Sequence, residues 1–437
     1  MTQASPYAEH LSVLLTRASN ALARGGFDHL LIAAGVLKYQ FLDDRPYGFR
    51  PNPHFLHFVP LVHHTDGWIV VTPGKKPTLI YFQPADYWHL PPAAPSGDWV
   101  EHFDIHIITQ PEQATALLPT QGRLAILGEA DAALPGFVPN NPPEVVNHLH
   151  WYRAFKTPYE LGLMRKANLL GARGHVAAER AFLAGASELD IHRAYLRGTG
   201  HTERELPYDN IVALNEHAAV LHYQYQDARA PDASRSFLID AGASVAGYAS
   251  DITRTRGNGD ELFGALVQGV DAVQLQLVDQ VRPGRDYRDI HLDAHLKLAG
   301  VLERLGIVRM SAPSQVETGV SSVFFPHGIG HLLGLQVHDV AGLAASETGG
   351  TIPRPEGHPF LRLTRTLDDG CVVTIEPGLY FIPMLLQTLR EGPHAHAVDW
   401  TKVEHLRAFG GVRIEDDVCC TADVPENLSR DAFAALA

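Results

Sequence analysis

The chain has 437 residues, of which 45% are hydrophobic and 19% are charged, and its formal net charge at pH 7 is -14. This length favours two or three domains with sizeable cores, and the acidic surplus argues against nucleic acid or an anionic membrane as a partner. The three cysteines include no CxxC pair, which argues against a disulfide framework and fits a reducing, cytoplasmic setting. No apolar run approaches the roughly 18 residues that span a membrane, and the N-terminus is typical of an amphipathic helix rather than a signal peptide.

The first part of the chain alternates helical and β-like segments. Leucine and alanine recur at helical spacing over residues 8–25, which predicts a helix there. Residues 133–143, rich in Pro, Gly and Asn, are the best linker candidate. We therefore predict a small α/β domain over residues 1–155 and a second domain over residues 156–437. The other expected elements of the first domain are β-like runs at 29–33, 67–72, 77–82 and 124–128, and a helical segment at 111–118.

The second part of the chain combines long helices with β-like runs that lie far apart in sequence. This order suits an antiparallel, curved sheet backed by helices better than a regular βαβ series, so the fold class is α/β of the α+β kind. The expected helices cover residues 158–184, 189–200, 259–282 and 287–305, and the expected strands cover residues 210–214, 219–223, 371–376 and 411–415.

Residues 236–255 have the pattern of a strand, a turn and a second strand. An apolar run leads to Asp240, Gly242 and Gly247 bracket the turn, and Asp251 lies in the β-like run 248–255. Such a hairpin can bring Asp240 and Asp251 side by side. Two carboxylates held that close repel each other, so either one takes up a proton or a cation lies between them.

Three further residues are candidate metal ligands. His331 follows a glycine-rich turn, and Glu376 and Glu415 each close an apolar strand, where an unpaired carboxylate is costly. Each residue alone also fits a turn, a cap or a surface loop. Together with Asp240 and Asp251, they would carry about four negative charges and one imidazole, which two divalent cations would neutralise. Such oxygen-rich ligands favour Mn²⁺ first, then Co²⁺, Fe²⁺ or Zn²⁺.

The motifs that carry these residues resemble those of the dinuclear metallopeptidases with the pita-bread fold, and more narrowly those of the bacterial Xaa-Pro dipeptidases (prolidases), relatives of the organophosphorus acid anhydrolases. The resemblance runs through nearly the whole chain, and no candidate ligand departs from the family pattern. The motifs are Asp240 with Asp251, Pro326-His-Gly-Ile-Gly-His331 with Val337-His338-Asp, Thr374-Ile-Glu-Pro-Gly378, and Arg413-Ile-Glu-Asp416.

The resemblance implies a role for each candidate ligand in binding two metal ions. Asp240 would bind one ion through both carboxylate oxygens. His331 and Glu376 would bind the other ion, and Asp251 and Glu415 would bridge the pair. Glu376 or Glu415 would also carry the proton to the leaving nitrogen.

The resemblance also implies residues that bind the substrate. His222 and His338 would orient the scissile carbonyl and stabilise the charge on its oxygen. Arg413 would hold a ligand carboxylate or the substrate, and either Arg362 or Arg365 would meet the free carboxylate of the proline. Tyr208 would form a pocket wall. Asp44 and Trp88 would close the site from the N-terminal domain of the other subunit of a homodimer.

The expected activity is hydrolysis of the Xaa-Pro bond of dipeptides by a hydroxide that bridges two metals, with a possible side activity on organophosphate triesters. Two alternatives remain at this point. An Xaa-Pro aminopeptidase would use the same metals on longer peptides. A non-catalytic peptide-binding protein of the same fold would usually have lost one or more ligands, because function resides in the site rather than in the fold.

Overall fold

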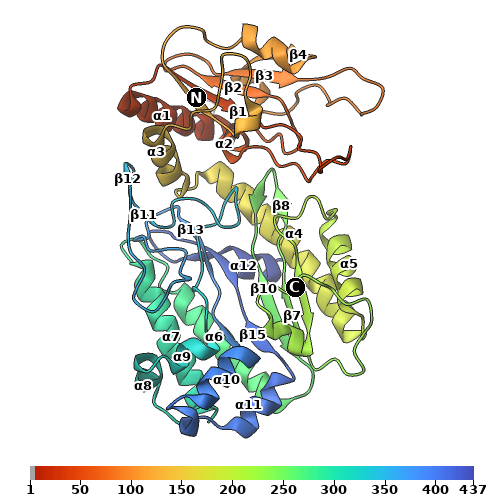
Figure 1. Cartoon of the computed structure of the whole chain (residues 1–437), viewed down its shortest axis with the longest axis vertical. Helices are drawn as coiled ribbons and strands as arrows, with labels where there is room; N and C mark the ends of the chain where they lie inside the picture. The colour runs from red at the N-terminus through yellow and green to blue at the C-terminus, as the bar shows by residue number, and fades with distance from the viewer. Residues whose placement is uncertain (1–4) are drawn as a thin grey trace. The chain divides into compact units, whose positions relative to one another are not determined.

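The structure is a computed structural model that describes residues 5–437, and the chain forms two compact units (Figure 1). The first unit runs to Leu161 and includes the segment Ala344–Thr351, and the second comprises Gly162–Leu343 and Ile352–Ala437. Within the described residues, no helix is both long enough and apolar enough to cross a membrane.

The first unit is built on a five-stranded mixed sheet with the strand order β4-β3-β2-β1-β5. The pairs β1 with β5 and β3 with β4 are parallel, and the other two pairs are antiparallel. The elements of this unit are α1 (Pro6–Gly25), β1 (His29–Ala33), α2 (Pro53–Phe58), β2 (Trp68–Val71), β3 (Thr78–Phe82), η1 (Val100–His102), β4 (Asp104–Ile108), η2 (Pro111–Ala116), β5 (Leu124–Leu127), η3 (Ala130–Ala132), α3 (Pro143–Arg153), β11 (Ala344–Ser346) and β12 (Gly349–Thr351).

Both faces of this sheet are buried, because alternate residues along each strand point to opposite sides. On one face, Leu30 and Ile32 of β1 share a core with Leu14 of α1. On the other face, Leu31 of β1 shares a core with Phe137, which lies in the loop between η3 and α3. The near-continuous apolar strands of this domain follow from this burial on both sides.

Most of the elements expected in the first unit are confirmed. Helix α1 begins at Pro6 because the Ser5 side chain accepts a hydrogen bond from Ala8 N at 3.2 Å. It ends at Gly25, because the next residue, Gly26, has a left-handed φ of 67°. Residues Pro111–Ala116 form a 3₁₀ helix rather than an α-helix. Strand β4 and helices α2 and α3 were not expected from the sequence.

The second unit contains several short antiparallel sheets and most of the long helices. Its three-stranded sheets have the orders β10-β7-β6 and β13-β16-β17, and its two-stranded sheets are β14-β15 and β8-β9. The elements are α4 (Pro158–Leu183), α5 (Glu188–Thr199), β6 (Ile211–Leu214), η4 (Asn215–Ala219), β7 (Ser236–Asp240), β8 (Ser244–Val245), β9 (Tyr248–Ala249), β10 (Thr253–Gly257), α6 (Glu261–Val278), α7 (Tyr287–Arg304), α8 (Ala312–Glu317), α9 (Val320–Phe324), β13 (Val372–Ile375), β14 (Gly378–Tyr380), α10 (Pro383–Glu391), η5 (Ala395–Ala397), α11 (Trp400–Arg407), β15 (Gly411–Arg413), β16 (Asp416–Cys419), β17 (Glu426–Asn427) and α12 (Leu428–Ala434).

The helices of the second unit back its strands, as the sequence predicted. Figure 1 shows α4 and α5 on one side of β7, β10 and β15, and α6 and α7 on the other. Helix α6 packs against β10, β13 and β15, and α7 packs against α6. The isolated bridges Thr253↔Glu415 and Leu332↔Val373 join β10 to the turn between β15 and β16, and the loop after α9 to β13. The strands therefore bring residues from distant parts of the sequence to one place.

Two expectations for the second unit need correction. The strand expected at 219–223 is wrong: Asn215 has a left-handed φ of 56° and starts the 3₁₀ helix η4, and the Tyr223 hydroxyl donates a hydrogen bond to Glu188 Oε2 at 2.8 Å. The second strand of the central hairpin is also interrupted, because the chain first forms the small β8-β9 hairpin and β10 begins only at Thr253. A Cβ at Gly242 would lie 2.0 Å from the Ser250 carbonyl oxygen, so this turn requires glycine.

Candidate metal centre

The two central aspartates lie together at the end of a strand pair. Asp240 is the last residue of β7 and is paired with Thr253, the first residue of β10. Asp251 lies two residues before Thr253 and is buried. The Tyr208 hydroxyl oxygen is 2.8 Å from Asp240 Oδ1 and 2.5 Å from Asp251 Oδ1. One phenol therefore contacts both carboxylates, and its single proton is shared between them.

His331 reaches the same site from the loop between α9 and β11. Its backbone N–H donates to Thr374 Oγ1 at 3.1 Å, and its carbonyl accepts from Thr374 N at 3.0 Å. Its ring Nδ1 lies 3.0 Å from the Leu332 carbonyl oxygen, which can only accept, so Nδ1 carries the proton. Its Nε2 faces Asp251 Oδ2 at 3.4 Å and Glu376 Oε1 at 3.9 Å. The neutral ring therefore keeps its Nε2 lone pair for a metal ion. In the metal-free site burial lowers the pKa of His331, but the hydrogen bond and charge of Asp251 outweigh burial and raise that pKa, so Nε2 can carry a proton towards Asp251 instead.

The two glutamates follow strand ends in the second unit. Glu376 comes directly after β13, and Glu415 lies between β15 and β16. Glu415 Oε2 accepts a hydrogen bond from Thr253 Oγ1 at 2.7 Å. Asp251, His331 and Glu415 each offer a ligand atom, and these atoms lie within 4.8 Å of one another. The structure thus brings all five candidate ligands to one buried region.

Arg413 is a cation that contacts one of the candidate ligands directly. Its Nη2 donates to Asp240 Oδ2 at 2.6 Å, its Nη1 donates to the Tyr380 hydroxyl at 3.1 Å, and its Nε donates to Thr253 Oγ1 at 3.3 Å. The Tyr380 hydroxyl is also 2.8 Å from His327 Nε2. The guanidinium therefore fixes one carboxylate while two hydroxyl groups fix the guanidinium.

Several residues around the ligands were not singled out from the sequence. Asp417 accepts from the backbone N–H of Asp251 at 3.1 Å and from Asn168 Nδ2 at 2.8 Å. Thr253 could have been found from the sequence. It lies two residues after Asp251, and in an extended segment the two side chains point to the same side. Tyr380 stands outside every ligand motif, and only the pairing of β14 with β15 places it beside Arg413.

The pKa values of the carboxyl groups in the metal-free site indicate that a bound cation would stabilise their ionised forms. Burial, with repulsion from neighbouring carboxylates, raises the pKa of Glu376 to about 7 and raises the pKa of Glu415 well above its usual range. Burial also raises the pKa of Asp240, although Arg413 opposes this shift. Burial acts in the same direction on Asp251, but its hydrogen bond to His331 outweighs it and lowers the pKa of Asp251. Divalent cations would relieve this repulsion, so the donor set fits two of them.

The predicted substrate-binding residues fall into two groups. In the second unit, the His338 ring makes an edge-on contact with the His331 ring, with centroids 4.4 Å apart. Desolvation of the ring, together with the nearby charges of His331 and Arg362, lowers the pKa of His338 to about 4, and the charge of His222 contributes. The charges of His222 and Arg362 therefore act on His338. In the first unit, Asp44 and Trp88 are exposed.

The two candidate arginines differ in their surroundings. The Arg362 side chain is exposed, whereas Arg365 is buried and accepts a backbone hydrogen bond from Tyr287 N at 3.1 Å. Burial also lowers the pKa of Arg365. The charge of the exposed Arg362 contributes to the lowered pKa of His338.

Comparison with known proteins relates the whole chain to metallopeptidases. The family model for the Xaa-Pro dipeptidase N-terminal domain matches residues 5–151, and that for metallopeptidase family M24 matches residues 162–422. The chain is 59% identical to the Xaa-Pro dipeptidase of Stenotrophomonas maltophilia (strain K279a), covering 98% of this chain and 97% of that protein. It is 57% identical to the Xaa-Pro dipeptidase of Xanthomonas campestris pv. campestris (strain B100), covering 98% of each.

Solved structures share the fold at lower identity. Aminopeptidase PepP of Pseudomonas aeruginosa matches with a TM-score of 0.71 and 23% identity, covering 97% of this chain and 98% of that chain. Proline aminopeptidase P II of Yersinia pestis matches with a TM-score of 0.70 and 24% identity over the full length of both chains. The expected architecture, a small N-terminal domain followed by a pita-bread domain, is confirmed. The chain belongs to metallopeptidase family M24, and within it to the group formed by its bacterial relatives named Xaa-Pro dipeptidase.

Proposed function

We propose that this chain hydrolyses the Xaa-Pro bond of dipeptides with a C-terminal proline, at a dinuclear metal centre held by Asp240, Asp251, His331, Glu376 and Glu415. The observation that carries the proposal is the meeting of four carboxylates and one available imidazole nitrogen in a buried region. The names of the full-length relatives at 57–59% identity supply the substrate class.

The ligand set suits two hard divalent cations, with Mn²⁺ as the proposed metal, since four of the five donors are carboxylates. When bound, such a pair supplies Lewis acidity and makes hydroxide available near neutral pH. Each oxygen of Asp240 already accepts one hydrogen bond: Oδ1 accepts from the Tyr208 hydroxyl and Oδ2 accepts from Arg413 Nη2. Each carboxylate oxygen keeps another lone pair, so Asp240 still serves as a ligand. Tyr208 and Arg413 thus act as positioning residues for this carboxylate.

Glu376 is the proposed proton carrier. The Oε2 atom of Glu415 is engaged by the Thr253 hydroxyl, whereas the Glu376 side chain is 18% exposed and can face substrate. A carboxylate oxygen of Glu376 accepts a proton from the attacking water and delivers it to the prolyl nitrogen as the bond breaks. That nitrogen carries no hydrogen in the substrate, so the delivered proton becomes the N–H of free proline.

His222, His338 and Arg362 form the proposed substrate-binding side of the site. Neutral His338, with a pKa of about 4, donates an N–H to the carbonyl oxygen as negative charge develops there, and His222 assists. Arg362 binds the free carboxylate of the proline through its guanidinium fork. Recognition of that carboxylate one residue beyond the scissile bond selects dipeptides over longer peptides.

The proposal extends to the whole assembly. Residues 1–155 would form a domain for dimerisation and closure, residues 156–437 would form the catalytic domain, and the protein would act in the cytoplasm as a homodimer. The partner's Asp44 and the partner's Trp88 would close the site. The exposure of Asp44 and Trp88 supports this role, because a closing residue must reach beyond its own domain.

The test is hydrolysis of Ala-Pro, Ala-Pro-Ala and Ala-Ala by metal-stripped protein, before and after addition of Mn²⁺. We expect metal-dependent cleavage of Ala-Pro alone. Equal cleavage of Ala-Pro-Ala would assign an aminopeptidase instead. Cleavage of none of the peptides by metal-loaded protein would overturn the peptidase proposal. An organophosphate triester in the same assay tests the proposed side activity, which we expect to be weak and dependent on the same metals.

A further inference from the structure

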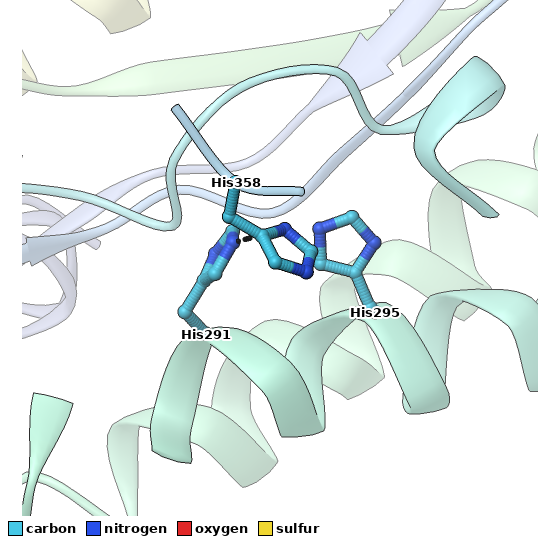
Figure 2. Close-up of side chains that lie close together, drawn as sticks. All are labelled: His291, His295 and His358. Carbon is cyan, nitrogen blue, oxygen red and sulfur yellow. Dashed lines mark hydrogen bonds between the residues drawn. The ribbon is translucent and has the colours of Figure 1, made fainter. Parts of the chain in front are cut away.

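A second group of histidines lies in the second unit, apart from the five carboxylate and imidazole ligands. His291 and His295 project from α7, and His358 projects from the loop that follows β12 (Figure 2). The centroid of the His291 ring is 4.8 Å from that of His295 and 4.6 Å from that of His358, and the His295 and His358 centroids are 4.6 Å apart. Each ring offers a nitrogen within 4.8 Å of the others.

The spacing on α7 is that of a helical metal chelate. His291-Leu-Asp-Ala-His295 places two imidazoles four residues apart, and therefore on one face of the helix. Zinc peptidases use the same spacing in H-E-x-x-H, where the glutamate after the first histidine is the general base. Leucine takes that position here, and Asp293 is engaged by Gln280 Nε2 at 2.5 Å. The spacing therefore provides ligands without a base, as a structural site requires.

The protonation of the three rings favours metal binding. Burial and the neighbouring histidines lower the pKa of His291 to about 2 and that of His295 to about 3, and burial lowers the pKa of His358. All three imidazoles are therefore neutral near pH 7 and need not lose a proton to bind a cation.

Two of the ring nitrogens face each other at a hydrogen-bond distance, and an ion bound between them would replace that hydrogen bond. His291 Nε2 is 2.9 Å from His358 Nδ1, and the buried Nδ1 of His291 has no hydrogen-bond partner among the described residues. A buried ring nitrogen without a partner is costly. The Ser321 hydroxyl holds Nδ1 of His295 at 3.2 Å, the kind of outer contact that orients a ligand histidine through its other nitrogen.

We propose that His291, His295 and His358 bind a single transition-metal ion, with Zn²⁺ as the first candidate. Three imidazoles with an open fourth position form a known type of zinc ligand set, and water can take that position because His358 is only partly buried. Neutral imidazoles suit Zn²⁺, Co²⁺, Ni²⁺ or Cu²⁺ and disfavour Mn²⁺ and Mg²⁺, which prefer oxygen. The two sites therefore differ in metal preference as well as in position.

Such an ion would fasten a loop to a helix. His358 lies between Ile352 and Leu361, in a stretch without helix or strand that leads directly to Arg362. The Arg354 Nε donates to the Leu361 carbonyl at 2.6 Å within this loop. Ligation of His358 would add a link from the loop to α7, so the ion would hold in place the segment that precedes Arg362.

The experiment counts Zn²⁺ bound by metal-stripped protein after equilibrium with a weak competing chelator, which removes ions held by single surface histidines. We expect three ions per chain in wild-type protein, two in His358→Ala, and three in the control His396→Ala, which removes an exposed histidine outside the cluster. Two ions in wild-type protein, or three in His358→Ala, would overturn the proposal. Two ions in wild-type protein would mean that the cluster is held by hydrogen bonds alone.

A second variant separates this result from the fate of the dinuclear centre. Asp251→Asn combined with Glu415→Gln removes two of the five ligands and leaves the histidine cluster intact. We expect this protein to bind one Zn²⁺, and one Co²⁺ with the strong visible absorption of a four-coordinate site. Binding of no ion would overturn the proposal even if His358→Ala failed to fold. Neither the number of bound Zn²⁺ ions nor that of bound Co²⁺ ions depends on peptide hydrolysis. This test therefore remains valid even if the protein proves not to be a peptidase.

Discussion

Arg413 Nη2 lies 2.6 Å from Asp240 Oδ2, and the two side chains are 5% and 14% exposed. Truncating one partner of a buried ion pair leaves the other charge uncompensated, at a cost of about 3–5 kcal/mol. We therefore expect Arg413→Gln to lower the free energy of unfolding of metal-stripped protein by about 3 kcal/mol, measured by urea denaturation. The control is Arg390→Gln, which removes a partly exposed pair with Glu404 and should cost less than about 1 kcal/mol. Equal losses in the two variants would contradict this account.

The raised pKa of Glu376 predicts a pH-dependent stability of the metal-free protein. A carboxyl whose folded pKa is about 7 binds its proton more tightly in the folded than in the unfolded protein. Its contribution to the free energy of unfolding therefore falls as pH rises from its unfolded pKa towards 7. Glu376→Gln removes this titration. We expect the stripped variant to become more stable than stripped wild-type protein as pH is raised from 5.5 to 8, measured by urea denaturation at each pH.

The control for this pH series is Glu356→Gln, which changes an exposed glutamate. Its stability relative to wild-type protein should stay constant across the same range. A constant difference for Glu376→Gln as well would show that Glu376 is ionised throughout.

The contacts of Tyr208 with both aspartates predict an effect on the metal centre. Its hydroxyl oxygen is within 2.8 Å of both carboxylates, and a hydrogen bond to a charged group contributes about 1.5–3 kcal/mol. We expect Tyr208→Phe to lower the affinity for Mn²⁺, kcat/KM for Ala-Pro, or both, so that the two fold-changes multiplied together are about 10- to 100-fold. The control Tyr87→Phe removes the hydroxyl of an exposed tyrosine and should change neither quantity. Unchanged metal affinity and kinetics in Tyr208→Phe would remove Tyr208 from the site.

The contrast between Arg362 and Arg365 predicts which arginine binds the substrate carboxylate. Arg362→Ala should raise KM for Ala-Pro by about 100-fold, the equivalent of a lost charged hydrogen bond, with a smaller change in kcat. Ala-Pro amide lacks the carboxylate, so its slow cleavage should be the same in wild-type protein and in Arg362→Ala. Arg365→Ala should reduce stability without a selective rise in KM, because Arg365 is buried. The opposite pattern would assign the carboxylate to Arg365.

The long elements could be predicted from the sequence because their patterns are local. The helix expected at 158–184 is α4, and those expected at 259–282 and 287–305 are α6 and α7. Short elements depend on distant partners instead. Strand β4 has mostly exposed or half-buried residues and no clear apolar alternation, and its pairing with β3 stabilises it. At 219–223 the apolar pattern suggested a strand, but the contacts of Glu188 with Tyr223 hold the segment in a turn.

In the candidate site, too, local features could be predicted from the sequence and contacts between distant segments could not. Carboxylates at strand ends are visible in the sequence, but their distances are not, since only the isolated bridge between Thr253 and Glu415 brings Glu415 to the end of the strand pair that carries Asp240. The residue types and their places beside strands and turns grouped the five candidate ligands, and the resemblance to a known family gave each of them a role. Tyr380 and Asp417 could not be predicted because a phenol or a second aspartate has no distinctive spacing, and only the folded chain places them beside Arg413 and Asp251.

The most direct test of the dinuclear centre is the number of Mn²⁺ ions per chain that restores Ala-Pro hydrolysis to metal-stripped protein. Stripped protein at a concentration far above the metal dissociation constant is titrated with Mn²⁺, and bound metal and initial rate are measured on the same samples. We expect the rate to rise until two ions are bound per chain and then to stay constant. Full activity at zero bound metal, or a rate that stays at zero with two ions bound, would contradict the proposed centre.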